Sequence, residues 1–464
     1  MAVIPLLALF SLQVQAQDLP VGKIIERVVC LKDASQSYAL YLPPNYTTDR
    51  RWPIIYAFDP AARGLRPVER FKEAAEKYGY IIVGSNNSRN FPDRPLAETI
   101  NAIFDDTQTR FSIDLNRVYT AGMSGGARVA GTVAQSLGDR AAGVILCGAG
   151  FSQAKLPEKP LSFPVFGVAG VEDFNWIELR QLHKTLDSIG SANRFVTFDG
   201  DHTWAPSDFC LTAVEWMEIQ AMKSGRRARD EKLIAELFDK MAGQARADES
   251  ANRVYEAFLK YEAIAKDFNG LREAPELTKK ADELRSSKEV KERLKQEKAA
   301  EQAQRQRSQE FFAAREQLNT AENPAVAMME IKSMISDLRK KAESRDESVD
   351  RLAARRALGS FYVSMNEEAS RHRAAQKYRE ATASLALAAE IRPDNPQIFF
   401  SLARTCALGG DKKQAIEALK KAVELGFTNA DEIAGNADFA SIRNEAAYKR
   451  LIEDARRKAQ SEKR

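Results

Sequence analysis

The sequence has few cysteines, few histidines and no strong excess of charge. Its four cysteines are scattered without a C-x-x-C pair, which gives no indication of a cysteine zinc site or a thioredoxin-like redox motif. Lys and Arg number 69 against 65 Asp and Glu, so no field of one sign surrounds the chain. We therefore expect no nucleic acid partner and no bound metal.

Long apolar runs are also absent beyond the first residues, where Ala2 to Leu12 form an apolar stretch. That stretch is too short to span a bilayer, and no later segment approaches about 18 uncharged apolar residues. Val14-Gln15-Ala16 follows it and resembles a signal peptidase site. We expect residues 1–16 to be an export signal on a secreted or periplasmic protein. The alternative is an ordinary buried strand or helix.

The next 200 residues alternate short β-rich apolar runs with amphipathic helical patterns, and this rhythm predicts a mostly parallel α/β sheet. The predicted strands span residues 25–31, 38–42, 53–58, 80–84, 117–121, 142–147, 164–169 and 194–198. The predicted crossover helices span residues 67–78, 96–111, 125–137 and 176–189. A chain of 464 residues is too long for one core, and we place this first domain at residues 17–222.

After Met222 the composition changes to Ala, Glu, Lys, Arg and Gln. Such a composition favours exposed helices in which opposite charges lie one turn apart. Residues 223–357 are therefore predicted to form a charged helical segment.

A repeat occurs near the carboxyl end, within a predicted helical domain at residues 358–464. Three apolar positions recur at the roughly 34-residue period of tetratricopeptide repeats: Ala381, Leu385 and Ala388 return as Ala415, Leu419 and Ala422. Over about residues 359–427 the chain resembles that family. A repeat pair cannot bury its own apolar face, so we expect it to stack on neighbouring helices and to offer a surface for a protein partner.

The motif with the clearest chemical meaning is Gly122-Met123-Ser124-Gly125-Gly126, which follows the strand 117–121 and precedes a helix. G-x-S-x-G between a strand and a helix is typical of a nucleophile elbow, whose sharp turn lifts the serine above the sheet. Ser124 is the candidate nucleophile. The Gly125 N–H, at the positive end of the helix, is the candidate oxyanion donor.

A serine nucleophile needs a base, and the chain offers three histidines. His183 falls inside an amphipathic helix and His372 in the charged helical part, where a packed or solvated histidine is the usual interpretation. His202 lies in a polar loop directly after the last predicted strand, which makes it the candidate base.

The acid of a triad holds the imidazole in line. Asp173 follows the strand 164–169, one strand before His202, and the order Ser, Asp, His is that of α/β-hydrolases. Glu172, Asp199 and Asp201 remain alternatives to Asp173.

The second oxyanion donor is expected from the loop after the strand 53–58. Pro60 has no N–H, so the prediction is Ala61.

Residues 23–222 resemble the esterase and polyhydroxybutyrate-depolymerase-like branch of α/β-hydrolases. The resemblance is carried by the nucleophile motif together with Tyr41-Leu42-Pro43-Pro44, Asp114-Leu115-Asn116-Arg117-Val118-Tyr119 and Asp201-His202-Thr203-Trp204. It implies cleavage of a small-molecule or polymeric carboxylic ester. The family commonly has His-Gly where this chain has Asp59-Pro60, so the oxyanion loop departs from the pattern.

The sequence therefore predicts ester hydrolysis through an acyl-enzyme on Ser124, without a cofactor. A serine peptidase on the same scaffold is one alternative. A binding or scaffold protein, in which the repeats act and the hydrolase domain is not catalytic, is the other.

Overall fold

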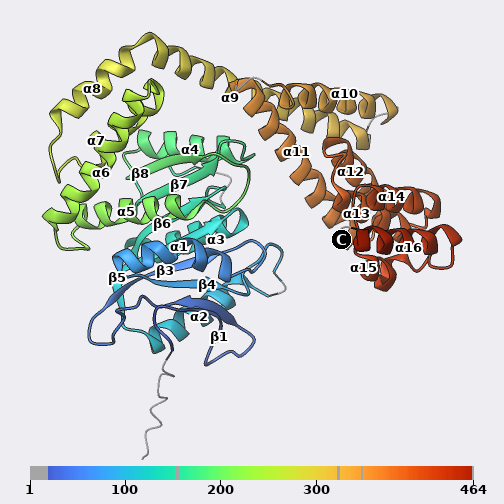
Figure 1. Cartoon of the computed structure of the whole chain (residues 1–464), viewed down its shortest axis with the longest axis horizontal. Helices are drawn as coiled ribbons and strands as arrows, with labels where there is room; N and C mark the ends of the chain where they lie inside the picture. The colour runs from blue at the N-terminus through green and yellow to red at the C-terminus, as the bar shows by residue number, and fades with distance from the viewer. Residues whose placement is uncertain (1–18, 93, 153–155, 321–323, 346–347, 462–464) are drawn as a thin grey trace, which may run out of the picture. The chain divides into compact units, whose positions relative to one another are not determined.

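The computed structural model describes residues 19–92, 94–152, 156–320, 324–345 and 348–461. The predicted export signal lies outside these residues. The chain packs as two compact units (Figure 1). The α/β unit comprises Met1–Gly170 and Glu178–Val290, and the helical unit comprises Val171–Ile177 and Lys291–Arg464.

The α/β unit is built on an eight-stranded sheet of order β1-β2-β4-β3-β5-β6-β7-β8. Its strands are β1 Ile24–Val29, β2 Ser37–Tyr41, β3 Trp52–Phe58, β4 Ile81–Ser85, β5 Ile113–Met123, β6 Ala141–Cys147, β7 Val165–Gly170 and β8 Asn193–Phe198. β2 pairs antiparallel with β1 and β4, while the remaining neighbours are parallel. The fold is that of an α/β-hydrolase, as predicted, and each predicted strand is present.

The central strands have the sequences expected of a parallel sheet covered on both faces. Every residue of β3, β4, β6 and β7 is buried, and such strands are continuous apolar runs. The helices around the sheet are α1 Leu65–Tyr78, α2 Leu96–Arg110, α3 Gly125–Leu137, α4 Trp176–Ser188 and α5 Ser207–Lys223. Side chains of α1 and α5 share one core with the sheet.

Helix α5 is an element that the sequence pattern did not reveal. Eleven of its residues are buried, among them the carboxyl-bearing Glu215 and Glu218. Lys240 pairs with Glu215 at 2.7 Å, and Arg227 pairs with Glu218. A helix covered on nearly all sides has no polar stripe, so the amphipathic period by which the other helices were recognised is missing.

The helices that follow α5 belong to the α/β unit. They are α6 Glu231–Ser250, α7 Val254–Asp267 and α8 Pro275–Ser286. Their apolar faces share a core with Ile219 and Met222 of α5. The predicted boundary at residue 222 therefore differs from the packing, in which the α/β unit continues to Val290.

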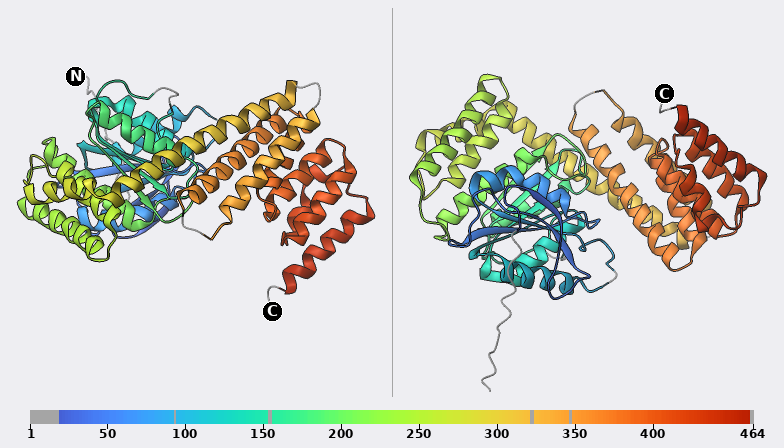
Figure 2. Two further views of the ribbon diagram at one scale, coloured as in Figure 1. Left: turned by 90° about the horizontal axis from the view of Figure 1, so that it is seen from above. Right: turned by 60° about the horizontal axis from the view of Figure 1, so that its bottom comes forward.

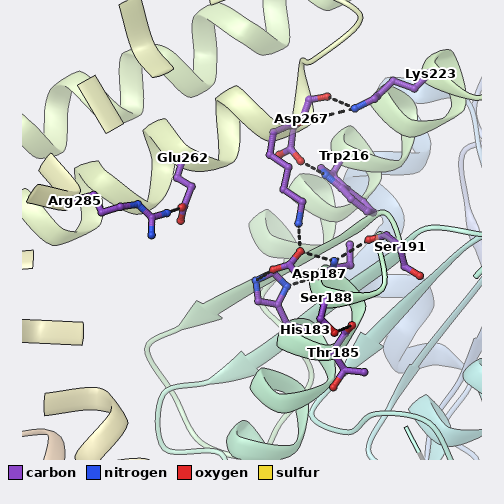
Figure 3. Close-up of polar contacts among 12 residues, drawn as sticks. His183, Thr185, Asp187, Ser188, Ser191, Trp216, Lys223, Glu262, Asp267 and Arg285 are labelled. Carbon is purple, nitrogen blue, oxygen red and sulfur yellow. Dashed lines mark hydrogen bonds and ion pairs between the residues drawn. The ribbon is translucent and has the colours of Figure 1, made fainter. Parts of the chain in front are cut away.

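Polar contacts at the end of α7 fix this extension to the sheet (Figure 3). The Asp267 carboxylate accepts hydrogen bonds from Trp216 Nε1 at 2.8 Å and from Arg194 at 2.7 Å. Lys266 forms an ion pair with Asp187 of α4. Because Asp267 is buried and accepts from both α5 and β8, removing its carboxylate would leave two donors without their acceptor.

The helical unit is an array of antiparallel helices (Figure 2). Its helices are α9 Lys288–Thr320, α10 Pro324–Ala342, α11 Val349–Ala374, α12 Tyr378–Ile391, α13 Pro396–Leu408, α14 Lys412–Glu424, α15 Ala430–Gly435 and α16 Ala446–Ser461. The six repeat positions predicted from the 34-residue period are all buried, in α12 and α14. That these helices belong to the tetratricopeptide family stays a prediction. Among the described residues, no helix combines the length and apolar character that a membrane span requires.

Candidate active site

The turn between β5 and α3 places Ser124 at the carboxyl edge of the sheet. Ser124 has φ 53° and ψ −121°, a conformation that side-chain-bearing residues rarely adopt. Its N–H donates to the carbonyl of Cys147 at 2.8 Å, and its carbonyl accepts from the N–H of Ala127 at 2.9 Å. The strained backbone is therefore held from both β6 and α3.

The glycines of the motif are explained by close backbone contacts. A Cβ built at Gly122 would collide with the carbonyl of Gly126, and one built at Gly126 would collide with the carbonyl of Phe58. Neither backbone oxygen can swing away as a flexible side chain would. The spacing G-x-S-x-G thus allows α3 to start directly against β3 and β5.

His202 lies beside this turn. Its Nε2 is 2.9 Å from Ser124 Oγ, within hydrogen-bond distance. The loop that carries it crosses the end of β7 so closely that a Cβ at Gly170 would collide with the carbonyls of Gly200 and Asp201. The structure thus brings together the predicted nucleophile and base, in the contact that proton transfer from Oγ to the imidazole requires.

The other two histidines have partners elsewhere. His183 of α4 bonds Asn193 through Nδ1, and its Nε2 lies 3.4 Å from Asp187 (Figure 3). Burial lowers the pKa of His183, which favours the neutral ring of a packed histidine. His372 lies 3.4 Å from Glu368, one turn earlier on α11.

The predicted acid, Asp173, lies in the loop between β7 and α4 and is fully buried. Its Oδ1 accepts a hydrogen bond from the N–H of Asn175 at 2.8 Å, and its carbonyl accepts from the N–H of Trp176 at 2.9 Å. This Asx turn fixes the carboxylate relative to its own backbone. The loop belongs to the helical unit, and the pairing of Asp173 with His202 stays a prediction.

The alternative acids are in less suitable surroundings. Asp199 and Asp201 are exposed, where water screens a carboxylate and side-chain freedom opposes a fixed geometry. Glu172 forms an ion pair with Arg355 of α11. Burial and a fixed rotamer therefore favour Asp173 among the four.

Sequence reasoning missed the role of Asp59, which organises the loop after β3. Its carboxylate is fully buried and accepts hydrogen bonds from Arg63 Nε at 2.9 Å, Trp204 Nε1 at 2.8 Å and the N–H of Ala61 at 2.8 Å. Burial alone would raise the pKa of Asp59, but the bonds from Arg63, Trp204 and Ala61 outweigh it and lower the pKa. One ionised carboxylate thus ties the β3 loop to the loop that carries His202.

The same contact bears on the predicted oxyanion donor. The Ala61 N–H is occupied by Asp59, so its donation to a reaction intermediate requires that bond to be shared or released. The role of Ala61 stays a prediction. The sequence did point to Asp59, because Asp59-Pro60 stands where the esterase branch commonly has His-Gly. It did not indicate that Asp59 would accept a hydrogen bond from Trp204.

A second residue that the sequence did not reveal is Asn90, in the loop after β4. A Cβ built at Gly125 would collide with Asn90 Oδ1, so the amide covers the residue that carries the candidate oxyanion N–H. The Asn90 N–H donates to the carbonyl of Pro60 at 2.8 Å, which links the β4 and β3 loops. Polar loops at the carboxyl ends of parallel strands are the general signal that points to such residues.

The described part of the chain contains no group of three or more His, Cys, Asp or Glu side chains arranged to hold a metal ion.

No family model matches the sequence, and no curated protein matches it. Solved structures are similar to part of the chain. The fluorophosphonate-binding serine hydrolase F of Staphylococcus aureus is 14% identical, with 43% of this chain and 99% of that chain covered and a TM-score of 0.34. Est1E from Butyrivibrio proteoclasticus is 15% identical over 42% of this chain and 99% of its own, with a TM-score of 0.33. The esterase of Pyrobaculum calidifontis is 13% identical over 45% of this chain and 87% of its own, with a TM-score of 0.34.

Proposed function

We propose that the protein is a serine hydrolase that cleaves carboxylic esters, with Ser124 as nucleophile, His202 as base and Asp173 as the acid. The observation that carries the proposal is the 2.9 Å contact between Ser124 Oγ and His202 Nε2. It occurs at a strained turn held by β6 and α3. A serine and a histidine packed for stability alone would not need the strain.

The chemistry follows from that contact. His202 takes the proton of Ser124 as Oγ attacks the ester carbonyl, and the protonated imidazole then gives the proton to the leaving alcohol. His202 then takes a proton from a water molecule, which attacks the carbonyl of the acyl-enzyme. The imidazolium returns the proton to Ser124 Oγ, and the carboxylic acid is released. The reaction consumes one ester and one water molecule and produces one carboxylic acid and one alcohol.

The oxyanion of each tetrahedral intermediate needs donors that are already in place. The Gly125 N–H at the start of α3 points from the positive end of the helix dipole and serves this purpose. Ala61 remains the second proposed donor, and Asn90 lines the same side of the turn. Asp173 acts through His202 by stabilising the imidazolium.

An ester substrate is proposed ahead of a peptide because the motifs around Ser124 and His202 resemble those of esterases, whereas the triad itself serves both substrates. Initial rates of the purified protein on a panel of acyl esters and on peptide amides separate the two activities. Faster turnover of a peptide amide than of every ester would replace the proposal by the peptidase alternative.

The direct test of the proposal uses Ser124→Ala. A fluorophosphonate probe forms a covalent bond only with an activated serine, so we expect it to label the wild type and not the variant. Ser136→Ala, an exposed serine of α3, is the matched control and should be labelled like the wild type. Equal labelling of wild type and Ser124→Ala would refute the assignment.

We also propose that residues 1–16 direct export and are removed before Gln17. The sequence pattern supports this, and N-terminal sequencing of the protein recovered from culture medium or periplasm tests it. A mature chain that retains Met1 would contradict it.

A further inference from the structure

The loop that carries Asp173 is connected to β7 and α4 along the chain, but it packs within the helical unit. Its partner there is the first part of α11. Three residues of that helix, Arg355, Arg356 and Gly359, face the loop, and the spacing i, i+1, i+4 places them on one side of a helix.

Arg356 makes two different contacts with the loop. Its Nε donates to the carbonyl of Val171 at 2.6 Å, and its guanidinium carbon lies 3.8 Å from the ring centre of Trp176. These contacts lie on either side of Asp173 in the sequence. Arg356 is itself 4% exposed, so water does not compete for its bonds.

Two further contacts on the same face of α11 hold residues that lie between Val171 and Trp176. Arg355 forms an ion pair with Glu172. A Cβ built at Gly359 would lie 3.3 Å from Phe174 Cβ, so Phe174 packs against the helix where a side chain is missing. Val171, Glu172 and Phe174, the neighbours of Asp173 along the chain, thus all contact α11.

Helix α11 is in turn fixed within the helical unit. Ala354, Ala357 and Phe361 are buried in its main core. Arg355 also donates from Nε to the carbonyl of Ala342 at 3.0 Å, at the end of α10. The conformation of the loop is therefore set by a helix that is set by the rest of the helical unit.

We propose that Arg356 is a positioning residue for the acid of the triad. The inference rests on the proposed function, because it gives Asp173 its role. Helices that only follow a complete hydrolase along the chain would not contact the loop that carries Asp173. In this chain they supply its supporting surface.

The chemistry of arginine explains why this residue type stands at position 356. A planar guanidinium donates a directed hydrogen bond from its edge and stacks on an aromatic ring with its face at the same time. Lysine keeps the charge but cannot hold both geometries. Arg356→Lys is therefore a test of geometry, and Arg356→Met removes charge and donors while keeping a side chain of similar length.

The experiment compares Arg356→Lys and Arg356→Met with Arg371→Met, which changes an exposed arginine farther along α11. Misplacing a catalytic group by about 1 Å lowers the rate by roughly 100-fold. We expect kcat to fall about 10- to 100-fold in the Arg356 variants with KM little changed. Arg371→Met should match the wild type. Thermal melting identifies any variant that has lost its fold. If Arg356→Met does not fold, kcat of Arg356→Lys is compared with that of the wild type.

The pH profile adds a measurement that a general packing defect would not change. A misplaced carboxylate stabilises protonated His202 less, so the acidic limb of kcat/KM should move to lower pH in the Arg356 variants. A profile that keeps its acidic limb while kcat falls would overturn the positioning role.

A double-mutant cycle with Asp173→Asn decides the pathway of the effect. If Arg356 acts through Asp173, Arg356→Met lowers kcat in the wild type and adds little in the Asp173→Asn background. Equal losses in both backgrounds, or an unchanged kcat in folded Arg356→Met, would overturn the inference while Ser124-dependent turnover persists. Turnover that survives Ser124→Ala would instead overturn the proposed function and this inference with it.

Discussion

The strained backbone of Ser124 leads to an unusual stability prediction. At φ 53° and ψ −121° a residue with a Cβ is strained by about 1–3 kcal/mol, whereas glycine is not. Glycine also gives the unfolded chain more freedom, which lowers stability by about 0.4–1 kcal/mol. Ser124→Ala and Ser124→Gly both lose the bond to His202, so that loss cancels between them. We expect Ser124→Gly to be more stable than Ser124→Ala by about 1 kcal/mol.

The assay is urea unfolding followed by tryptophan fluorescence. Trp52, Trp204 and Trp216 lie in the α/β unit and are three of the four tryptophans, so the signal reports mainly that unit. The matched control is Ser136, an exposed residue within α3. There the order should reverse, with Ala more stable than Gly by about 1 kcal/mol. An Ala variant at position 124 that is more stable than the Gly variant would refute the strain argument.

The remaining predictions concern the groups around the turn. Asp59→Asn should lower the free energy of unfolding by about 3 kcal/mol at neutral pH, because donors on three residues, Ala61, Arg63 and Trp204, lose a charged acceptor. The pKa of Asp59 is lowered in the folded state. The contribution of the ionised Asp59 to the free energy of unfolding is therefore complete above its unfolded-state pKa, near 3.9, and is lost as the pH falls through its folded-state pKa. Urea unfolding should show a difference between Asp59→Asn and the wild type at pH 7 that disappears in acid. Gly126→Ala should destabilise the protein by more than about 2 kcal/mol, since backbone blocks the new Cβ, while Gly243→Ala in open space on α6 should stabilise it by about 1 kcal/mol. Gly125→Ala should be less destabilising in an Asn90→Ala background, since the side chain that blocks the Cβ is then absent.

Each of these predictions has an outcome that contradicts it. A constant difference between Asp59→Asn and wild type from pH 7 down into acid would show that the ionised carboxylate is not the source of the stability. Gly126→Ala as stable as Gly243→Ala would contradict the close contact with β3. Strict additivity of Gly125→Ala and Asn90→Ala in unfolding free energy would contradict the contact between these residues.

Strands and amphipathic helices were predictable because their burial leaves a period in the sequence. β3 and β6 are continuous apolar runs, since a parallel sheet is covered on both faces. α5 was missed for the related reason that a helix buried on nearly all sides keeps no polar stripe. The packing boundary at Val290 was missed because α6 to α8 resemble the later helices in composition while their apolar faces pack on α5.

The site divides in the same way between local and long-range information. The contact of Ser124 with His202 could be anticipated, since an elbow motif and a histidine after the last strand each have a local pattern. Asp59 and Asn90 act through contacts with Trp204 and Gly125, which lie on other loops. Arg356 meets the Val171 carbonyl from another part of the chain altogether. No local pattern encodes such pairs, because they depend on how loops from different strands converge.

The central claim, that Ser124 is acylated during turnover, is tested most directly by trapping the intermediate. Acid quenching during hydrolysis of a slowly deacylated ester, followed by peptide mass spectrometry, locates the acyl group. We expect the acyl mass on the peptide that contains Ser124, and its absence in Ser124→Ala. Steady ester turnover with the acyl group on another residue, or with unmodified Ser124 throughout, would contradict the account.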